Sequence, residues 1–350
     1  MNNVYSNDKA RNRCIYRNKN KIEFEIYNEH KQISYTADEL AINIISYLTG
    51  EFTDSEILHM VNQKLSSKKI NKHFLKDFCN QLFCDGLIVY KSLKNNYELL
   101  DRENNYLNMY PNKNKFTDEF LKKLMNKHIT VIGCGGLGSN LLEQLFRIGV
   151  QNYTIVDFDK VEPENLANQA IFTSKDINKS KVDVIKKFGK TVNPAININN
   201  ISLKVDQTNI NQVIAGTDFV FSCADYPSIK NVSLLVSNEC LKKGVPHIVG
   251  GGYSGHEASL GTMVIPKKTF TWKDYLETSK LGRNKNQEII PPVVNMSFLP
   301  IIKIIAAIQI NEFFKLFNNN DNLLLINSFN EFDMNLYQIR KTMIRKESTE

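Results

Sequence analysis

The chain has 350 residues, of which 42% are hydrophobic, and a formal net charge of +7. This length exceeds one average domain and suits two, and the apolar fraction is sufficient for a sizeable core. The basic residues are densest from Lys9 to Lys21, where Asn rather than stacking aromatic residues separates them, so nucleic-acid binding is only weakly indicated. The N-terminus lacks an apolar signal segment, and Pro300 and Lys303 interrupt the longest apolar stretch, Phe298 to Ile310. We therefore expect a cytoplasmic protein without a membrane partner.

The first part of the chain has the pattern of a basic arm, residues 1–21, followed by a small domain, residues 22–92. We interpret the arm as solvated, or as a surface for an acidic protein partner. Periodicity and capping residues predict the elements of the domain in this order: a strand at Ile22 to Tyr27, a helix at Ala37 to Leu48, a second helix capped near Thr53 or Asp54, a third helix at Asn71 to Cys84 and a strand at Leu87 to Tyr90.

This order, with the stretches ELAINIISYLTGEFTDSEI and FCNQLFCDGLIV, resembles the winged-helix leader-peptide recognition domain of the PqqD type. The resemblance covers about seventy residues. It implies that the domain holds the leader sequence of a peptide. An ordinary winged helix, which could bind DNA, is the alternative.

Residues 93–115 are polar and rich in Asn, which is typical of a linker to a second domain, residues 116–350. From Leu124 onward, strands alternate with helices. The predicted elements are a strand at His128 to Gly133, a helix at Ser139 to Gly149, a strand at Tyr153 to Asp157, a helix at Lys179 to Lys190 and a strand at Asp218 to Cys223. Such alternation predicts an α/β fold with a doubly wound parallel sheet.

A glycine-rich loop joins the first strand of this domain to its helix. Gly133, Gly135 and Gly138 have the G-x-G-x-x-G spacing, which lets backbone amides and a helix N-terminus approach phosphate groups. A dinucleotide-dependent oxidoreductase would use the same loop, with Asp157 as its ribose partner. The loop by itself therefore leaves two classes of enzyme open.

The residues after the loop resemble the ThiF/E1 superfamily of ATP-dependent adenylating enzymes, whose domain is Rossmann-like. The matching stretches are Asp157-Phe-Asp159-Lys-Val-Glu-Pro-Glu-Asn165-Leu-Ala-Asn168-Gln169, Lys179-Ser-Lys181 and Ser222-Cys-Ala-Asp225-Tyr-Pro227. The resemblance implies that Asp157 grips the ribose hydroxyls, that Asn165 and Lys181 contact phosphates and that Asp225 holds Mg²⁺. The implied nucleotide site also includes Gly133, Gly135, Gly136, Gly138, Asp159, Asn168 and Gln169. Attack at the α-phosphorus of ATP expels pyrophosphate, so a cation, a lysine and fixed dipoles suit this chemistry.

Each of these side chains also has a purely structural interpretation. Asp157 and Asp159 could be turn residues at the end of a strand. Lys181 could be a solvated helix lysine, and Asp225 could be the N-cap of a helix that begins near Ile229. Their order after a glycine loop favours the nucleotide site.

Two positions depart from the superfamily pattern. Asn168 stands where the family motif Asn-Leu-x-Arg-Gln has an arginine, and the arginine that the partner subunit supplies would fall at residues 101–109, where Arg102 is the one candidate. Loss of these cations costs transition-state stabilisation of several kcal/mol unless another basic residue, such as Arg147 or Lys179, replaces them. The sequence therefore supports nucleotide binding more strongly than turnover.

The cysteines argue against thioester transfer. The chain has six cysteines and no CxxC pair, so neither a disulfide framework nor a paired-thiolate zinc site is indicated. After Asp225 the one remaining cysteine is Cys240, on a predicted helix, where a core side chain is the favoured interpretation. Where relatives place their first zinc-binding cysteines, this chain has Phe270, Trp272 and Tyr275, and we expect their packing to replace the metal.

The closer resemblance is to the peptide-modifying branch of the superfamily, which includes the maturation enzymes of microcin C and pantocin A. The matching stretches cover most of residues 125–310 and are Gly133 to Asn140, Asp157 to Gln169, Asn178 to Val182, Ser222 to Pro227, Gly250 to Tyr253 with Gly261 and Pro266, and Pro291 to Asn295. The resemblance implies a homodimer that adenylates a carboxyl or amide group of a precursor peptide, with dehydration or cyclisation, in antibiotic biosynthesis.

In such a reaction a nitrogen of the peptide attacks the activated carbon, so no protein nucleophile is needed. His247, His256 or Glu257 could act as a base, although polar loop residues are the favoured interpretation. We expect the helix at Pro300 to Leu316 to be buried, partly at the dimer interface. Two alternatives remain open: activation of a sulfur-carrier protein with a Gly-Gly tail, and a non-catalytic nucleotide-binding interaction protein.

Overall fold

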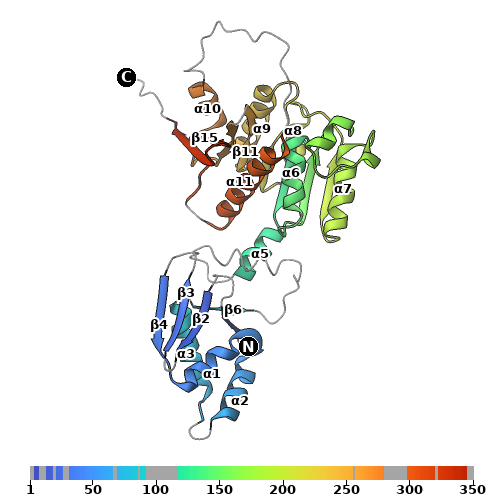
Figure 1. Cartoon of the computed structure of the whole chain (residues 1–350). Coiled ribbons are helices and arrows are strands. Elements are labelled where there is room, and N and C mark those ends of the chain that lie inside the picture. Colours follow the sequence, from blue (N-terminus) through green and yellow to red (C-terminus); the bar gives the residue numbers. More distant parts are fainter. Residues whose placement is uncertain are drawn as a thin grey trace. The chain divides into compact units, whose positions relative to one another are not determined.

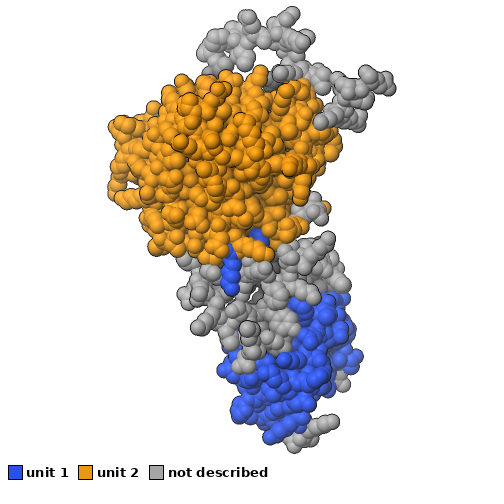
Figure 2. Space-filling model, turned by 180° about the vertical axis from the view of Figure 1, so that it is seen from behind, with its two compact units in different colours: residues 1–122 blue, residues 123–350 orange. Residues whose placement is uncertain are grey.

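The computed structural model describes residues 4–7, 13–18, 21–26, 31–65, 69–85, 87–91, 117–254, 257–279, 298–319 and 322–344. Contacts along the chain divide it into two compact units, residues 1–122 and 123–350, which Figure 2 colours separately. The predicted linker, residues 93–115, lies entirely outside the described residues, so this boundary stays a prediction.

In its described residues, unit 1 combines helices with two antiparallel three-stranded sheets. One sheet consists of β2 (Arg13–Asn18), β3 (Lys21–Ile26) and β4 (Lys31–Thr36), and in the other β1 (Val4–Asn7) lies between β5 (Thr49–Thr53) and β6 (Ile88–Lys91). The stretch that we expected to be a solvated basic arm therefore contributes strands β1 and β2. The alternation of apolar and polar residues in that stretch is short, and most of its residues are polar, which is why the sequence did not indicate these two strands.

The helices of unit 1 begin at residues whose side chains accept hydrogen bonds from the first turn. They are α1 (Glu39–Tyr47), capped by Asp38, α2 (Asp54–Lys64), capped by Thr53 in a capping box with Glu56, and α3 (Lys72–Cys84), capped by Asn71. Their apolar faces meet in one core that includes Ile44, Leu48, Ile57, Leu75 and Cys79. The winged-helix assignment of this unit stays a prediction.

Unit 2 is built on a six-stranded sheet in the order β14-β11-β10-β7-β8-β9. The strands are β7 (His128–Ile132), β8 (Asn152–Val156), β9 (Asn197–Ile201), β10 (Phe219–Ser222), β11 (His247–Val249) and β14 (Thr262–Val264). All neighbours run parallel except β14, which pairs antiparallel with β11. The predicted doubly wound α/β sheet is therefore confirmed, with one antiparallel edge strand that the sequence did not indicate.

Helices cover both faces of this sheet (Figure 1). They are α6 (Gly136–Leu145), α7 (Lys181–Val192), α8 (Ile210–Val213), α9 (Ile229–Lys243) and α11 (Leu299–Phe317), and α5 (Thr117–Met125) precedes β7. From β7 the chain first adds β8 and β9 on one side and then crosses to β10 on the other. The carboxyl end of β7 is therefore the point where the strand order reverses, which is where open α/β sheets bind ligands.

A second sheet and the helix α11 complete the unit. The sheet is antiparallel and consists of β12 (Gly252–Ser254), β13 (Glu257–Ser259), β15 (Ser328–Asp333) and β16 (Gln338–Met343). Helix α11 packs along α6, and its buried side chains include Ile302, Ile305 and Phe313. Burial of α11 is as expected, and its part in a dimer interface stays a prediction. Of the helices that the structure describes, none combines the length and hydropathy that a bilayer-spanning segment requires.

Aromatic side chains fill the region where relatives were expected to hold zinc. Trp272, the first residue of α10 (Trp272–Ser279), donates a hydrogen bond from Nε1 to Ser233 Oγ at 2.8 Å. The ring of Tyr275 is fully buried and meets the ring of Phe329 edge-on at 5.6 Å between centroids. The packing that we expected is present, and its replacement of a metal stays a prediction.

Candidate nucleotide site

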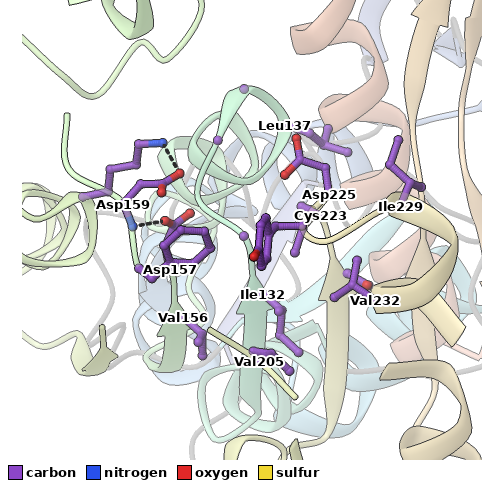
Figure 3. A pocket seen from close by; sticks show the side chains of 18 of the residues that line it. Ile132, Leu137, Val156, Asp157, Asp159, Val205, Cys223, Asp225, Ile229 and Val232 are labelled. Atoms are coloured by element: carbon purple, nitrogen blue, oxygen red, sulfur yellow. Dashed lines mark hydrogen bonds and ion pairs between the residues drawn. The ribbon is translucent and has the colours of Figure 1, made fainter. Parts of the chain in front are cut away.

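A cavity of about 560 Å³ opens at the carboxyl ends of β7, β8 and β10 (Figure 3). Its size is that of a site for a small molecule or cofactor. The predicted site residues that line it are Gly133, Gly135, Gly136, Asp157, Asp159, Asn165, Asn168, Gln169, Lys181 and Asp225. Gly138 is buried and does not line the cavity, and Arg102 lies outside the described residues. Ten of the twelve predicted residues, from four separate stretches, thus meet around one cavity.

The three motif glycines have different physical roles. A Cβ at Gly133 would lie 2.5 Å from the backbone nitrogen of Ala224, and one at Gly138 would lie 1.9 Å from the carbonyl oxygen of Gly133. A Cβ at Gly135 would meet no atom within 4 Å. Gly133 and Gly138 therefore let the loop fold, whereas Gly135 keeps the cavity side of the loop open.

Helix α6 begins at Gly136, three residues before the predicted start at Ser139, so the last motif glycine lies inside its first turn. Its N-cap is Gly135, and no side chain caps this turn. Because the first amides of a helix have no intrahelical acceptor, such a start suits an anionic ligand.

Asp157 is a turn residue that also lines the cavity. Its side chain is 8% exposed; Oδ2 accepts a hydrogen bond from the amide of Cys134 at 2.6 Å and Oδ1 one from the amide of Asp159 at 2.8 Å. Burial raises its pKa, and the two amides and the charge of Lys181 oppose that rise. The carboxylate therefore ties the glycine loop to the end of β8, and each oxygen keeps a lone pair for a ligand hydroxyl.

Lys181 is buried, so its interpretation as a solvated lysine is wrong. It is 5% exposed as the first residue of α7, and its Nζ lies 3.2 Å from Asp159 Oδ2. A lysine ammonium is buried in this way only when a charged partner or ligand compensates it. Asp159, whose side chain is about half exposed, supplies that partner at the cavity wall.

A short 3-10 helix, η4 (Pro163–Ala167), carries the next part of the motif. Asn165 Oδ1 accepts a hydrogen bond from the amide of Glu162 at 3.0 Å, which fixes the start of η4. Asn140 Nδ2 donates to the carbonyl oxygens of Gly136 and Asn168, at 2.7 and 2.8 Å. Asn140 therefore joins η4 to the first turn of α6, a positioning role that the sequence did not indicate.

Asp225 follows β10 and is exposed to the cavity, where Figure 3 places it near Leu137. The N-cap of α9 is Ser228, whose Oγ accepts from the amide of Asn231 at 3.2 Å, so the interpretation of Asp225 as an N-cap is wrong. An exposed carboxylate is a hard oxygen ligand of the kind that Mg²⁺ uses together with phosphate oxygens. Asp225 therefore fits the predicted role of holding Mg²⁺ with a bound nucleotide.

Three residues that the sequence did not single out close the rim of the cavity. The rings of Phe158 and Tyr226 are 37% and 52% exposed and lie 5.5 Å apart between centroids. The Nζ of Lys204 lies 4.2 Å from the centre of the Tyr226 ring and 4.6 Å from that of Phe158. Lys204 follows β9, and because that edge strand was not predicted, no spacing pointed to it.

The other residues proposed from the sequence lie away from the cavity. Arg147 stacks on Phe188, and Lys179 pairs with Asp176, so neither lines the cavity as a replacement for the family arginine. His247 is fully buried, its Nε2 lies 2.8 Å from Ser237 Oγ, and burial lowers its pKa to about 4.

Glu257 and Cys240 also lie away from the cavity. Glu257 pairs with Arg340 on the second sheet, so neither it nor His247 is brought to the cavity as a base, and His256 lies outside the described residues. Cys240 is fully buried, and burial raises its pKa, as expected for a core thiol.

Comparison with known proteins supports the predicted superfamily. The ThiF family model matches residues 110–350. The molybdopterin-synthase adenylyltransferase of Haemophilus influenzae is 30% identical over 224 residues, which are 63% of this chain and 87% of that protein. The SAMP-activating enzyme E1 of Haloferax volcanii is 30% identical over 132 residues, 37% of this chain and 47% of that protein.

Two solved structures share the fold over nearly the whole chain. PaaA matches with a TM-score of 0.73 and 17% identity, covering 96% of this chain and 99% of that one. MccB of Escherichia coli, in a structure with ATP, matches with a TM-score of 0.69 and 20% identity, covering 99% and 98%. The family and the fold predicted from the residues after the glycine loop are thus confirmed, and the chain belongs to the ThiF family.

Proposed function

We propose that this protein binds ATP with Mg²⁺ and adenylates a carboxyl or amide group of a ribosomally made precursor peptide, which then loses water and cyclises. The observation that carries the proposal is the meeting of Asp157, Lys181 and Asp225 around an uncapped helix start, in a chain that shares its fold over nearly its full length with PaaA and MccB. MccB, called a microcin C7 biosynthetic enzyme, has been crystallised with ATP and with MccA.

The two ends of the cavity suit the two ends of ATP. Ile132, Val156 and Val205 gather at one end in Figure 3, where they offer an apolar surface to the base. Asp157 accepts hydrogen bonds from the ribose hydroxyls, and the phosphates lie along the glycine loop toward Asp225. This orientation places the α-phosphate near Lys181.

In the reaction, an oxygen of the peptide carboxyl or amide attacks the α-phosphorus, and the bond to pyrophosphate breaks. The Lys181 ammonium and the first amides of α6 stabilise the negative charge that develops on the phosphate oxygens. Mg²⁺ held by Asp225 would neutralise charge on the leaving pyrophosphate. A nitrogen of the same peptide then attacks the activated carbon, AMP leaves, and the peptide has lost one water.

No protein nucleophile is required for this sequence. Cys223 lines the cavity, but burial raises its pKa to about 12, so it is a protonated thiol at neutral pH. Transfer of the acyl group to a cysteine is therefore disfavoured at this site.

Unit 1 is proposed to hold the leader sequence of the precursor. Most of it, residues 1–109, precedes the family match, and it carries its own core. We further propose a homodimer, in which Arg102 of one subunit serves the site of the other, and a cytoplasmic location.

A second candidate function is activation of a sulfur-carrier protein, because the H. influenzae relative, at 30% identity, is a molybdopterin-synthase adenylyltransferase. A third, non-catalytic nucleotide binding, is favoured by the uncharged Asn168 at the cavity wall.

The test is to incubate the purified chain with ATP, Mg²⁺ and either a precursor peptide or a sulfur carrier, with an Asp225→Ala variant as control. The proposal predicts AMP and pyrophosphate only with the precursor, and a peptide lighter by one water. Pyrophosphate exchange with the sulfur carrier alone would favour the second function, and ATP binding without any turnover would favour the third.

A further inference from the structure

The charge balance of the cavity is unfavourable for a triphosphate. Its described lining holds four carboxylates, Asp157, Asp159, Glu164 and Asp225, but only two basic side chains, Lys181 and Lys204. Asn168, at the position of the family arginine, brings no charge. A polyanion such as ATP requires cations that carboxylates do not already neutralise.

Lys181 cannot supply this charge in full, because its ammonium pairs with Asp159 at 3.2 Å. In the part of the chain that the structure describes, no carboxylate pairs with Lys204. Its ammonium lies over the faces of two aromatic rings, Tyr226 and Phe158. A ring face attracts a cation without neutralising its charge, so the full positive charge of Lys204 remains available to a ligand.

The direction of the Lys204 side chain brings this charge across the cavity. Its backbone follows β9, on the side of β7 where the apolar base surface lies. Its ammonium lies 4.2 Å from the ring of Tyr226, which directly follows Asp225 at the end of β10, on the other side of β7. The ammonium is therefore held over the residue next to the proposed Mg²⁺ ligand.

We propose that Lys204, held between Phe158 and Tyr226, contacts the phosphates of the bound nucleotide and supplies in the same subunit the positive charge that Asn168 lacks. The inference rests on the proposed binding of ATP. It differs from the family arrangement in that the cation comes from the segment after β9 and not from the motif at the end of η4.

The test compares ligands with and without phosphates. Dissociation constants of ATP, in the presence of Mg²⁺, and of adenosine are measured by calorimetry for the wild-type chain and for Lys204→Met and Lys204→Arg. Lys179→Met serves as the matched control, because Lys179 is an exposed lysine that pairs outside the cavity. Thermal unfolding of each variant verifies that it is folded.

The inference predicts that Lys204→Met weakens ATP binding about tenfold, the effect of one hydrogen bond to a charged group, and leaves adenosine binding unchanged. Lys204→Arg and Lys179→Met should bind ATP within about twofold of wild type, since each keeps the cavity charge. Tyr226→Leu should weaken ATP binding by a smaller factor. Combined with Lys204→Met in a double variant, it should cause no further loss of ATP affinity.

Two results would overturn the inference. Equal losses for ATP and adenosine in Lys204→Met would mean that Lys204 acts on the base or on the fold, and unchanged ATP binding would mean that it has no role. Failure of the wild-type chain to bind ATP would instead contradict the proposed function. This outcome differs from the two above because it is seen in the wild-type chain, before any residue is substituted.

Discussion

Alanine at Gly138 and alanine at Gly135 should have separable effects, although both glycines belong to one motif. The Cβ of Gly138→Ala would lie 1.9 Å from the carbonyl oxygen of Gly133, which is 1.5 Å less than the 3.4 Å at which ordinary contacts begin. The oxygen belongs to the backbone and the backbone fixes the position of the Cβ, so neither can move aside by changing a rotamer. We expect a loss of about 3 kcal/mol in the free energy of unfolding, at the upper end of the cost of overpacking.

Gly135→Ala has a different consequence because its Cβ enters open space on the lining of the cavity. The loss of a glycine N-cap costs less than about 1 kcal/mol. The methyl group would, however, occupy the surface that the proposed function assigns to the phosphates, and we expect ATP affinity to fall by about tenfold or more.

Calorimetry of the full chain measures both effects. For a unit of this size, a loss of 3 kcal/mol lowers the Tm of Gly138→Ala by roughly 6–12 °C, whereas Gly135→Ala should melt within about 3 °C of wild type. ATP titration of Gly135→Ala supplies the affinity. A Gly138→Ala protein as stable as wild type, or a Gly135→Ala protein that binds ATP normally, would refute this assignment of roles.

Three further predictions concern the charged side chains of the cavity. Lys181→Met should lower the rate of AMP formation by about 10²–10³-fold. Lys186→Met should not lower this rate, because Lys186 lies on the same helix but is bonded to Asn200 outside the cavity. Equal rates of AMP formation in the two variants would contradict the role of Lys181. Asp225→Ala should abolish the dependence of ATP affinity on Mg²⁺ without affecting the free energy of unfolding. Ser228→Ala should lower the free energy of unfolding by about 1 kcal/mol and keep the dependence on Mg²⁺. Unfolding curves, and ATP titrations with and without Mg²⁺, measure the two effects. Because burial raises the pKa of Asp157, its carboxyl is protonated at a higher pH than that of an exposed aspartate. ATP affinity measured by titration should therefore fall as the pH is lowered in wild type, and this fall should be absent in Asp157→Asn. The same raised pKa makes the contribution of Asp157 to folding most favourable at low pH, and that contribution is lost as the pH rises through the folded-state pKa.

The parts of unit 2 that the sequence predicts correctly are those in which burial leaves a continuous apolar run. β7 and β10 are buried almost throughout and were found from their hydrophobicity alone. β9 is the edge strand of the parallel sheet, carries the residues NINNI and is partly exposed, so no apolar run marked it. Lys204 escaped notice for the same reason, because its place in the site depends on that strand.

The residues that line the cavity were predictable because a motif fixes their order, but their local contacts required coordinates. Asp225 and Ser228 are both short polar residues before α9, and only the hydrogen bond from the amide of Asn231 to Ser228 separates the cap from the site residue. His247 lies near the glycine-rich segment in sequence, yet it points to Ser237 of α9 and away from the cavity, since a strand alternates its side chains between faces. Distance along the chain carries no information about that choice of face.

Transfer of AMP to the peptide is tested most directly by the fate of one oxygen atom. A precursor peptide whose activated carboxyl or amide group carries a heavy oxygen isotope is incubated with the protein, ATP and Mg²⁺, and the products are analysed by mass spectrometry. Attack at the α-phosphorus predicts that the heavy oxygen leaves the peptide in AMP. Heavy oxygen in inorganic phosphate, with ADP as the other product, would show attack at the γ-phosphorus and contradict the adenylation mechanism.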